Sequence, residues 1–232
     1  METFNNITKA ISWGDTEYLE KTINKPNGMS LSKFTKIYNE LYNYKWSPFM
    51  RVVERQDLPL AKKMIELGFE PRTFDVLGSI CSCSFNNYDE GHELIKLFIN
   101  EGKVDVNKKC SRNNGLNGWQ FINPLQFACV EVKPLAIKIL LENGADPNIT
   151  FHQTGLLMYK YTPLDLITIN QKAINYAKSE IIEVSPFLID NESLYDKKKF
   201  NNYINLKNES IELLKKYGGK SYKELQNNKE SV

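Results

Sequence analysis

One pattern occurs twice in the sequence with the same internal spacing, and it restricts the fold more than any other feature. Residues 47–71 begin Ser-Pro-Phe-Met-Arg-Val-Val, and residues 123–148 begin Asn-Pro-Leu-Gln-Phe-Ala-Cys. In both segments a proline precedes a glycine by 20 positions, Pro48 and Gly68 in the first and Pro124 and Gly144 in the second. Proline after a capping residue begins a helix, and glycine ends one. The recurrence therefore predicts a helical repeat protein.

These residues resemble the ankyrin repeat, whose pattern Thr-Pro-Leu-His-x-Ala-Ala, second helix, Leu-Leu-x-x-Gly-Ala-Asp-x-Asn they carry in order. Thr162-Pro163-Leu164-Asp165-Leu166 opens another unit, Asp75 to Asn107 gives a degenerate copy, and Ile7 to Ile23 matches the helical half of an N-terminal unit. The resemblance implies an all-α ankyrin-repeat solenoid of stacked antiparallel helix pairs with projecting β-hairpin loops. We expect one domain over 1–232, with units at about 5–42, 43–71, 72–107, 119–149 and 158–219 and a polar tail at 220–232.

The physical reason for stacking is independent of the family name. A single helix pair cannot bury its apolar face, so neighbouring pairs must share a continuous core. The outer face of the last unit must be exposed to solvent, and Glu212, Lys215 and Lys216 supply polar side chains there. We expect the tail from Lys220 to Val232 to be frayed.

The last unit is longer than the others. Gly144 and Gly218 are 74 positions apart, against 34 from Gly68 to Gly102, which indicates an insertion at about 168–206. The insertion is expected to be ordered and helical, because Ala173, Ile174, Ala177, Ile181 and Ile182 recur at helical spacing and Lys197 to Leu206 can form another helix. Residues 197–232 hold nine Lys against four Glu, which fits either a solvated helix face or a patch for an acidic partner.

Two hairpin loops are also long, at residues 108–118 and 151–155. Both fall between repeats, where insertions are tolerated and where recognition is often built. For each loop two interpretations remain open: an insertion that has no role in binding, and a loop that contacts the partner.

Composition narrows the class of protein. The net charge is +2, and only four of the 30 basic residues are Arg, so we expect no nucleic-acid partner. Met1 to Asn6 lacks the features of a signal peptide, and no apolar run approaches the ~18 residues of a membrane span. We therefore expect a cytoplasmic protein with reduced thiols and no membrane contact, monomeric on its own.

Motifs for metal or cofactor chemistry are weak. Cys81-x-Cys83, with Cys110, Cys129 and two histidines, does not have the spacing of structural zinc, and Cys129 takes a small core position of its helix, equivalent to Val53. Gly218-Gly219-Lys220-Ser221 imitates the end of a P-loop but follows a helix instead of preceding one. We predict no metal and no cofactor.

Catalytic motifs are missing as well. No His-Glu-x-x-His, Gly-x-Ser-x-Gly or dinucleotide-binding glycine pattern occurs, and two histidines offer few near-neutral proton shuttles. Repeat stacks generally present extended surfaces instead of deep pockets, which favours binding. We predict that the chain is not an enzyme, although an unrecognised carboxylate pair remains an alternative.

The resemblance also implies where a partner protein binds. Ankyrin partners usually meet the hairpin tips and the exposed side of the first helices. Aligned through each proline, these positions are Tyr44, Trp46, Glu54, Arg55, Arg72, Phe74, Trp119, Gln120, Ile122, Val130, Glu131, Tyr159, Tyr161 and Asn170. Trp and Tyr dominate interface hot spots because they bury a large area with few rotatable bonds, but some of these aromatics could instead staple the hairpins to their neighbours.

The expected function is a non-enzymatic protein-binding module of unknown partner. Within binding, the alternative is an inhibitor or immunity-type protein that occludes one enzyme or toxin. A third possibility is a secreted, host-directed effector.

Overall fold

The computed structural model describes residues 2–42, 48–71, 76–82, 88–113, 119–152, 160–168 and 197–230. The described residues are mostly helical, as the sequence predicts. They fall into two compact units, Met1–Asp105 and Val106–Val232. No helix in these ranges is long and apolar enough to cross a membrane.

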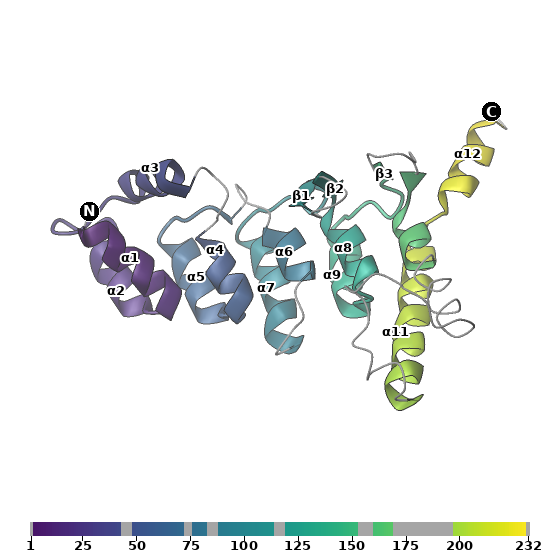
Figure 1. The fold of residues 1–232 in the computed structure, drawn as a ribbon, viewed down its shortest axis with the longest axis horizontal. Coiled ribbons are helices and arrows are strands. Elements are labelled where there is room, and N and C mark those ends of the chain that lie inside the picture. The colour runs from purple at the N-terminus through teal and green to yellow at the C-terminus, as the bar shows by residue number, and fades with distance from the viewer. Residues whose placement is uncertain are drawn as a thin grey trace. The chain divides into compact units, whose positions relative to one another are not determined.

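The first unit consists of helix pairs in chain order (Figure 1). Its elements are α1 (Glu2–Trp13), α2 (Thr16–Thr22), α3 (Leu31–Tyr42), α4 (Phe49–Arg55), α5 (Leu58–Glu66), α6 (Val76–Ser82) and α7 (Tyr88–Asn100). The pairs are α1 with α2, α4 with α5, and α6 with α7. Helix α4 contacts α1 and α6, whereas α5 contacts α2 and α7. First helices thus form one layer and second helices another.

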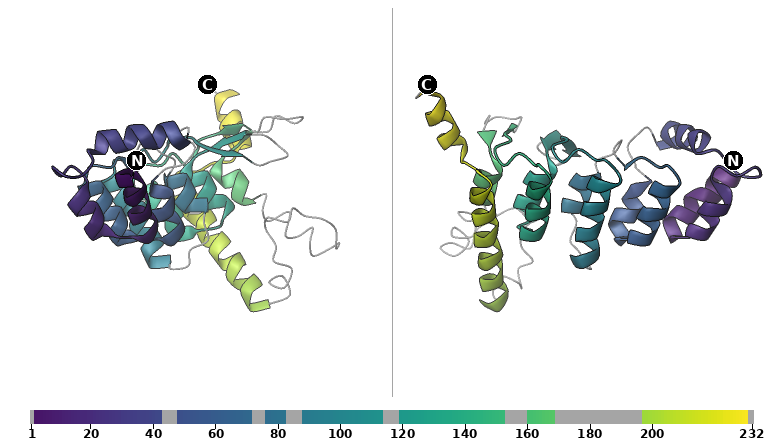
Figure 2. Two further views of the ribbon diagram at one scale, coloured as in Figure 1. Left: turned by 60° about the vertical axis from the view of Figure 1, so that its left-hand side comes forward. Right: turned by 180° about the vertical axis from the view of Figure 1, so that it is seen from behind.

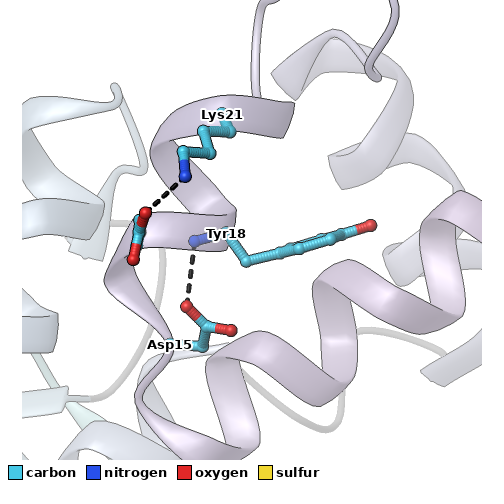
Figure 3. A network of polar contacts seen from close by, with 4 residues as sticks. Asp15, Tyr18 and Lys21 are labelled. Atoms are coloured by element: carbon cyan, nitrogen blue, oxygen red, sulfur yellow. Dashed lines mark hydrogen bonds and ion pairs between the residues drawn. The ribbon is translucent and has the colours of Figure 1, made fainter.

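Local caps explain where the second helices begin and end. The Asp15 carboxylate accepts a hydrogen bond from the Tyr18 N–H at 2.9 Å, beside the Lys21–Glu17 ion pair (Figure 3). Asp57 caps α5 in the same way, and Gly68 follows that helix with φ +94°. Glycine adopts this left-handed conformation without the steric cost of a Cβ, so the sequence signal and the helix end coincide.

Helix α3 is an element that the repeat pattern does not predict. It buries Phe34, which is 0% exposed, and Tyr38. The Phe34 ring lies 5.2 Å from Phe4 of α1 and 5.7 Å from Phe69, which follows α5. Residues 31–42 therefore cover apolar surface of the helix pairs on either side of them in the sequence.

The second unit begins with a β-hairpin. Its elements are β1 (Cys110–Asn113), β2 (Trp119–Ile122), α8 (Pro124–Val130), α9 (Pro134–Glu142), β3 (Phe151–His152), β4 (Lys160–Tyr161), a helical stretch at 163–168, α11 (Lys197–Lys216) and α12 (Tyr222–Glu230). Strands β1 and β2 pair antiparallel, as do β3 and β4. Helix α9 packs against α8 on one side and α11 on the other; Figure 2 (right) shows α11 alongside α9.

Two asparagines in this unit make the same pair of hydrogen bonds. The Asn107 amide donates to the Gly144 carbonyl at 3.0 Å and accepts from the Asp146 N–H at 2.8 Å. The Asn148 amide donates to the Gly218 carbonyl at 3.0 Å and accepts from the Lys220 N–H at 2.8 Å. In each case the partners are a glycine and the residue two positions after it. The contacts repeat although the chain between the asparagine and its glycine differs in length.

Three helix starts in this unit share one capping arrangement. Asn123 and Gln126 exchange side-chain and backbone hydrogen bonds at the start of α8. Thr162 and Asp165 do the same at 163–168, and Ser221 and Glu224 do so at α12. Each arrangement satisfies backbone N–H groups that a helix start leaves unpaired.

The capping arrangement at α12 changes the expectation for the tail. Residues 222–230, expected to fray, form this helix, and its Tyr222 N–H donates to the Asp165 carboxylate at 2.7 Å. The stretch expected as a separate helix at 197–206 is continuous with the closing helix of the last unit, as the first half of α11. The isoleucines expected to make the insertion helical lie outside the described residues.

Apolar positions taken from the repeat pattern are buried. Leu125 and Leu140 are each 0% exposed. Cys81 and Cys129 are also buried and form no disulfide, which confirms that these two cysteines occupy core positions.

Candidate binding surface

The two hairpins of the second unit are neighbours. In β1–β2, Asn113 pairs with Trp119 and Cys110 pairs with Ile122. In β3–β4, Phe151 pairs with Tyr161. Strand β2 contacts β3, so the two ladders lie side by side. This hairpin layer, residues 110–113, 119–122, 151–152 and 160–161, holds four of the six expected binding positions that the structure describes in the second unit.

The register of β2 separates residues that the sequence groups together. Trp119, at the end of the ladder next to residues 114–118, alternates with Gln120 along the strand. Successive strand positions belong to opposite faces of a ladder, so Trp119 and Phe121 share one face and Gln120 and Ile122 the other. Phe121 is absent from the expected binding set, although the two-residue period of a strand would have placed it with Trp119.

Tyr161 is the expected position on the second hairpin, and it is half-buried on β4. Its partner across the ladder is Phe151. Phe151 was not among the expected contacts, because alignment through prolines looks only at residues just before a helix. The layer therefore carries aromatic residues on β2, β3 and β4.

Val130 and Glu131 are separated from β2 by the length of α8. The helix has seven residues and so is about 10 Å long, with β2 preceding its start and Val130 at its end. Both residues are half-buried. Burial of Tyr203 on α11, together with the nearby charge of Glu131, raises the pKa of the tyrosine phenol. Glu131 thus faces the packing of α11 and belongs to a different region from the hairpin layer.

In the first unit, Glu54 and Arg55 lie exposed at the end of α4 and contact residues of their own unit. The Glu54 carboxylate pairs with Arg51 at 2.7 Å. The Arg55 guanidinium donates to the Ser12 carbonyl at 2.6 Å and lies 3.6 Å from the Asp57 carboxylate. Arg55 therefore links the end of α1 to the loop between α4 and α5. Exposed pairs of this kind contribute about 0–1 kcal/mol to stability.

The remaining expected contacts, Tyr44, Trp46, Arg72, Phe74, Tyr159 and Asn170, lie outside the described residues.

No group of three or more His, Cys, Asp or Glu side chains that could hold a metal ion occurs in the part of the chain that the structure describes.

Neither a scan against protein-family models nor a search of curated proteins finds a match to this chain.

Proposed function

We propose that the chain is an ankyrin-repeat protein that binds a partner protein through the hairpin layer, without catalysing a reaction. The observation that carries the proposal is the contact between β2 and β3, which brings two aromatic-bearing hairpins into one surface. Aromatic side chains on neighbouring hairpins can supply the large contact area that interface hot spots need.

The repeat assignment has its own support. The Asn107 and Asn148 hydrogen bonds link equivalent positions of successive segments, and the Asn123–Gln126 and Thr162–Asp165 capping pairs begin successive first helices. A repeat architecture requires neighbouring units to meet through recurring contacts of this kind.

Capture of the partner tests the proposal. The wild-type chain, Trp119→Ala and Tyr217→Ala are each immobilised and exposed to extract of the native organism, and retained proteins are identified by mass spectrometry. Tyr217 is the matched control, because it is an exposed aromatic of the same unit that follows α11, outside the hairpin layer. We expect one protein to be retained by wild type and Tyr217→Ala but not by Trp119→Ala. Equal retention by all three would remove the hairpin layer as the binding surface.

Activity assays on the captured protein then separate the binding modes. An inhibitor or immunity-type protein abolishes the activity of its partner at saturating concentration, whereas a scaffold leaves that activity unchanged.

A further inference from the structure

Lys207 on α11 is buried in a way that the binding function does not require. The residue is 0% exposed, and its Nζ has no hydrogen-bond partner among the described residues. Lys215, further along the same helix, is exposed and lies 3.6 Å from Glu212. Removing an ammonium group from water without a partner is costly, so a buried lysine favours its neutral form.

The position of Lys207 on the helix shows which face of α11 carries it. Lys207, Ser210 and Leu214 are all 0% exposed and are spaced by three and four residues, so they share one face of α11. Helix α11 packs against α9. The amine therefore lies on the packed face of α11.

Among the described residues, the charged groups around this contact leave the amine without a hydrogen-bond partner. In the loop between α8 and α9, Glu131 acts on the Tyr203 phenol, and Lys133 adds positive charge. On α9, Lys138 and Glu142 are exposed and lie 3.9 Å apart. Asp165, in the helical stretch 163–168, accepts hydrogen bonds from Thr162 and Tyr222. Desolvation is the cause that lowers the pKa of Lys207.

We propose that the packing of α11 on α9 depends on the protonation state of Lys207. Protonation of the buried amine weakens this contact and favours local opening of α11 and α12. The rest of the unit is held by apolar residues such as Leu140 and Ile137, which do not titrate. Local opening of one element below the global unfolding free energy is a common property of folded chains.

The sign of the pH effect follows from linkage. Burial lowers the pKa of Lys207 from 10.5 to about 8 in the docked state, and an undocked, solvated amine keeps the higher value. The undocked state therefore binds more protons between these two pKa values, and docking strengthens as the pH rises through that window. From pH 7.5 to 9.5 the docking equilibrium constant should increase about 20-fold.

Hydrogen exchange of the full chain, resolved to peptides of α11, tests the proposal. Protection factors are compared at pH 7.5, 8.5 and 9.5 for wild type, Lys207→Met and Lys215→Met, because a protection factor removes the intrinsic pH dependence of exchange. The wild-type factor for α11, divided by that of Lys207→Met, should rise about 20-fold over this range. The same ratio taken with Lys215→Met should stay flat. Tyr203 is common to all three chains, so its titration cancels in the ratios.

Two results would overturn the proposal. One is a flat ratio for Lys207→Met, and the other is a ratio for Lys215→Met that rises as steeply as the ratio for Lys207→Met. If Lys207→Met does not fold, the titration of the Lys207 side chain is followed by NMR in the wild-type protein. A titration midpoint near 8 supports the proposal, whereas a midpoint near 10.5 contradicts it.

Discussion

Asn148 shows how a single residue holds two segments of the second unit together. Its amide makes hydrogen bonds to Gly218 and Lys220, 70 and 72 positions away in sequence. These bonds tie the segment after α9 to the end of α11, and Asn107 makes the equivalent bonds to Gly144 and Asp146. Side-chain amides used in this way satisfy backbone groups that the helix ends leave unpaired.

Removing the Asn148 amide should destabilise the protein measurably. Each net hydrogen bond contributes about 0.5–1.5 kcal/mol, so Asn148→Ala should lower the free energy of unfolding by about 1–3 kcal/mol in urea denaturation. Asn208, exposed on α11, is the control, and Asn208→Ala should change stability by less than about 0.5 kcal/mol. Similar values for the two variants would mean that the Asn148 contacts carry no stability.

Helix α9 allows a matched comparison of two leucines on one element. Leu140 is 0% exposed, whereas Leu135 is 45% exposed in the first turn. Leu140→Ala should lower the free energy of unfolding by about 2–5 kcal/mol through loss of burial and the cavity left behind. Leu135→Ala should change it by about 0.5 kcal/mol or less. Equal costs at the two positions would show that the buried face of α9 has been assigned wrongly.

Elements with local signals could be predicted, and those without could not. Pro124 and Gly144 mark the limits of the α8–α9 pair because capping and turn preferences act within a few residues. Helix α3 was missed because the repeat pattern specifies no helix at residues 31–42. The apolar face formed there by Leu31, Phe34 and Tyr38 is short. Helix α12 was missed because its polar composition suggested fraying, although Ser221 and Glu224 have the spacing of a capping box.

The candidate surface was predictable only in part, for a similar reason. The proline alignment found Trp119 and Tyr161, which precede helices. It could not give the strand register that places Phe121 with Trp119, nor the contact of Arg55 with Ser12, 43 residues away. Long-range contacts depend on packing, which no local pattern encodes.

At the scale of the whole molecule, the thiols should play no part in metal binding. Cys81 and Cys129 are each 0% exposed, so they act as small apolar side chains. The purified protein should contain less than one zinc per chain by elemental analysis, and a chelator should leave its melting temperature unchanged. One stoichiometric zinc would contradict this prediction.

The most direct test of the central claim pairs two measurements on the whole protein, its melting temperature and its affinity for the captured partner. Both are determined for wild type, Trp119→Ala and Tyr217→Ala. If the hairpin layer binds the partner, Trp119→Ala should weaken the complex by about 2–4 kcal/mol, mainly through faster dissociation, with a small change in melting temperature. Tyr217→Ala should change neither quantity. A large fall in melting temperature with unchanged affinity per folded molecule would show that Trp119 only fixes the hairpin, and that the partner binds elsewhere.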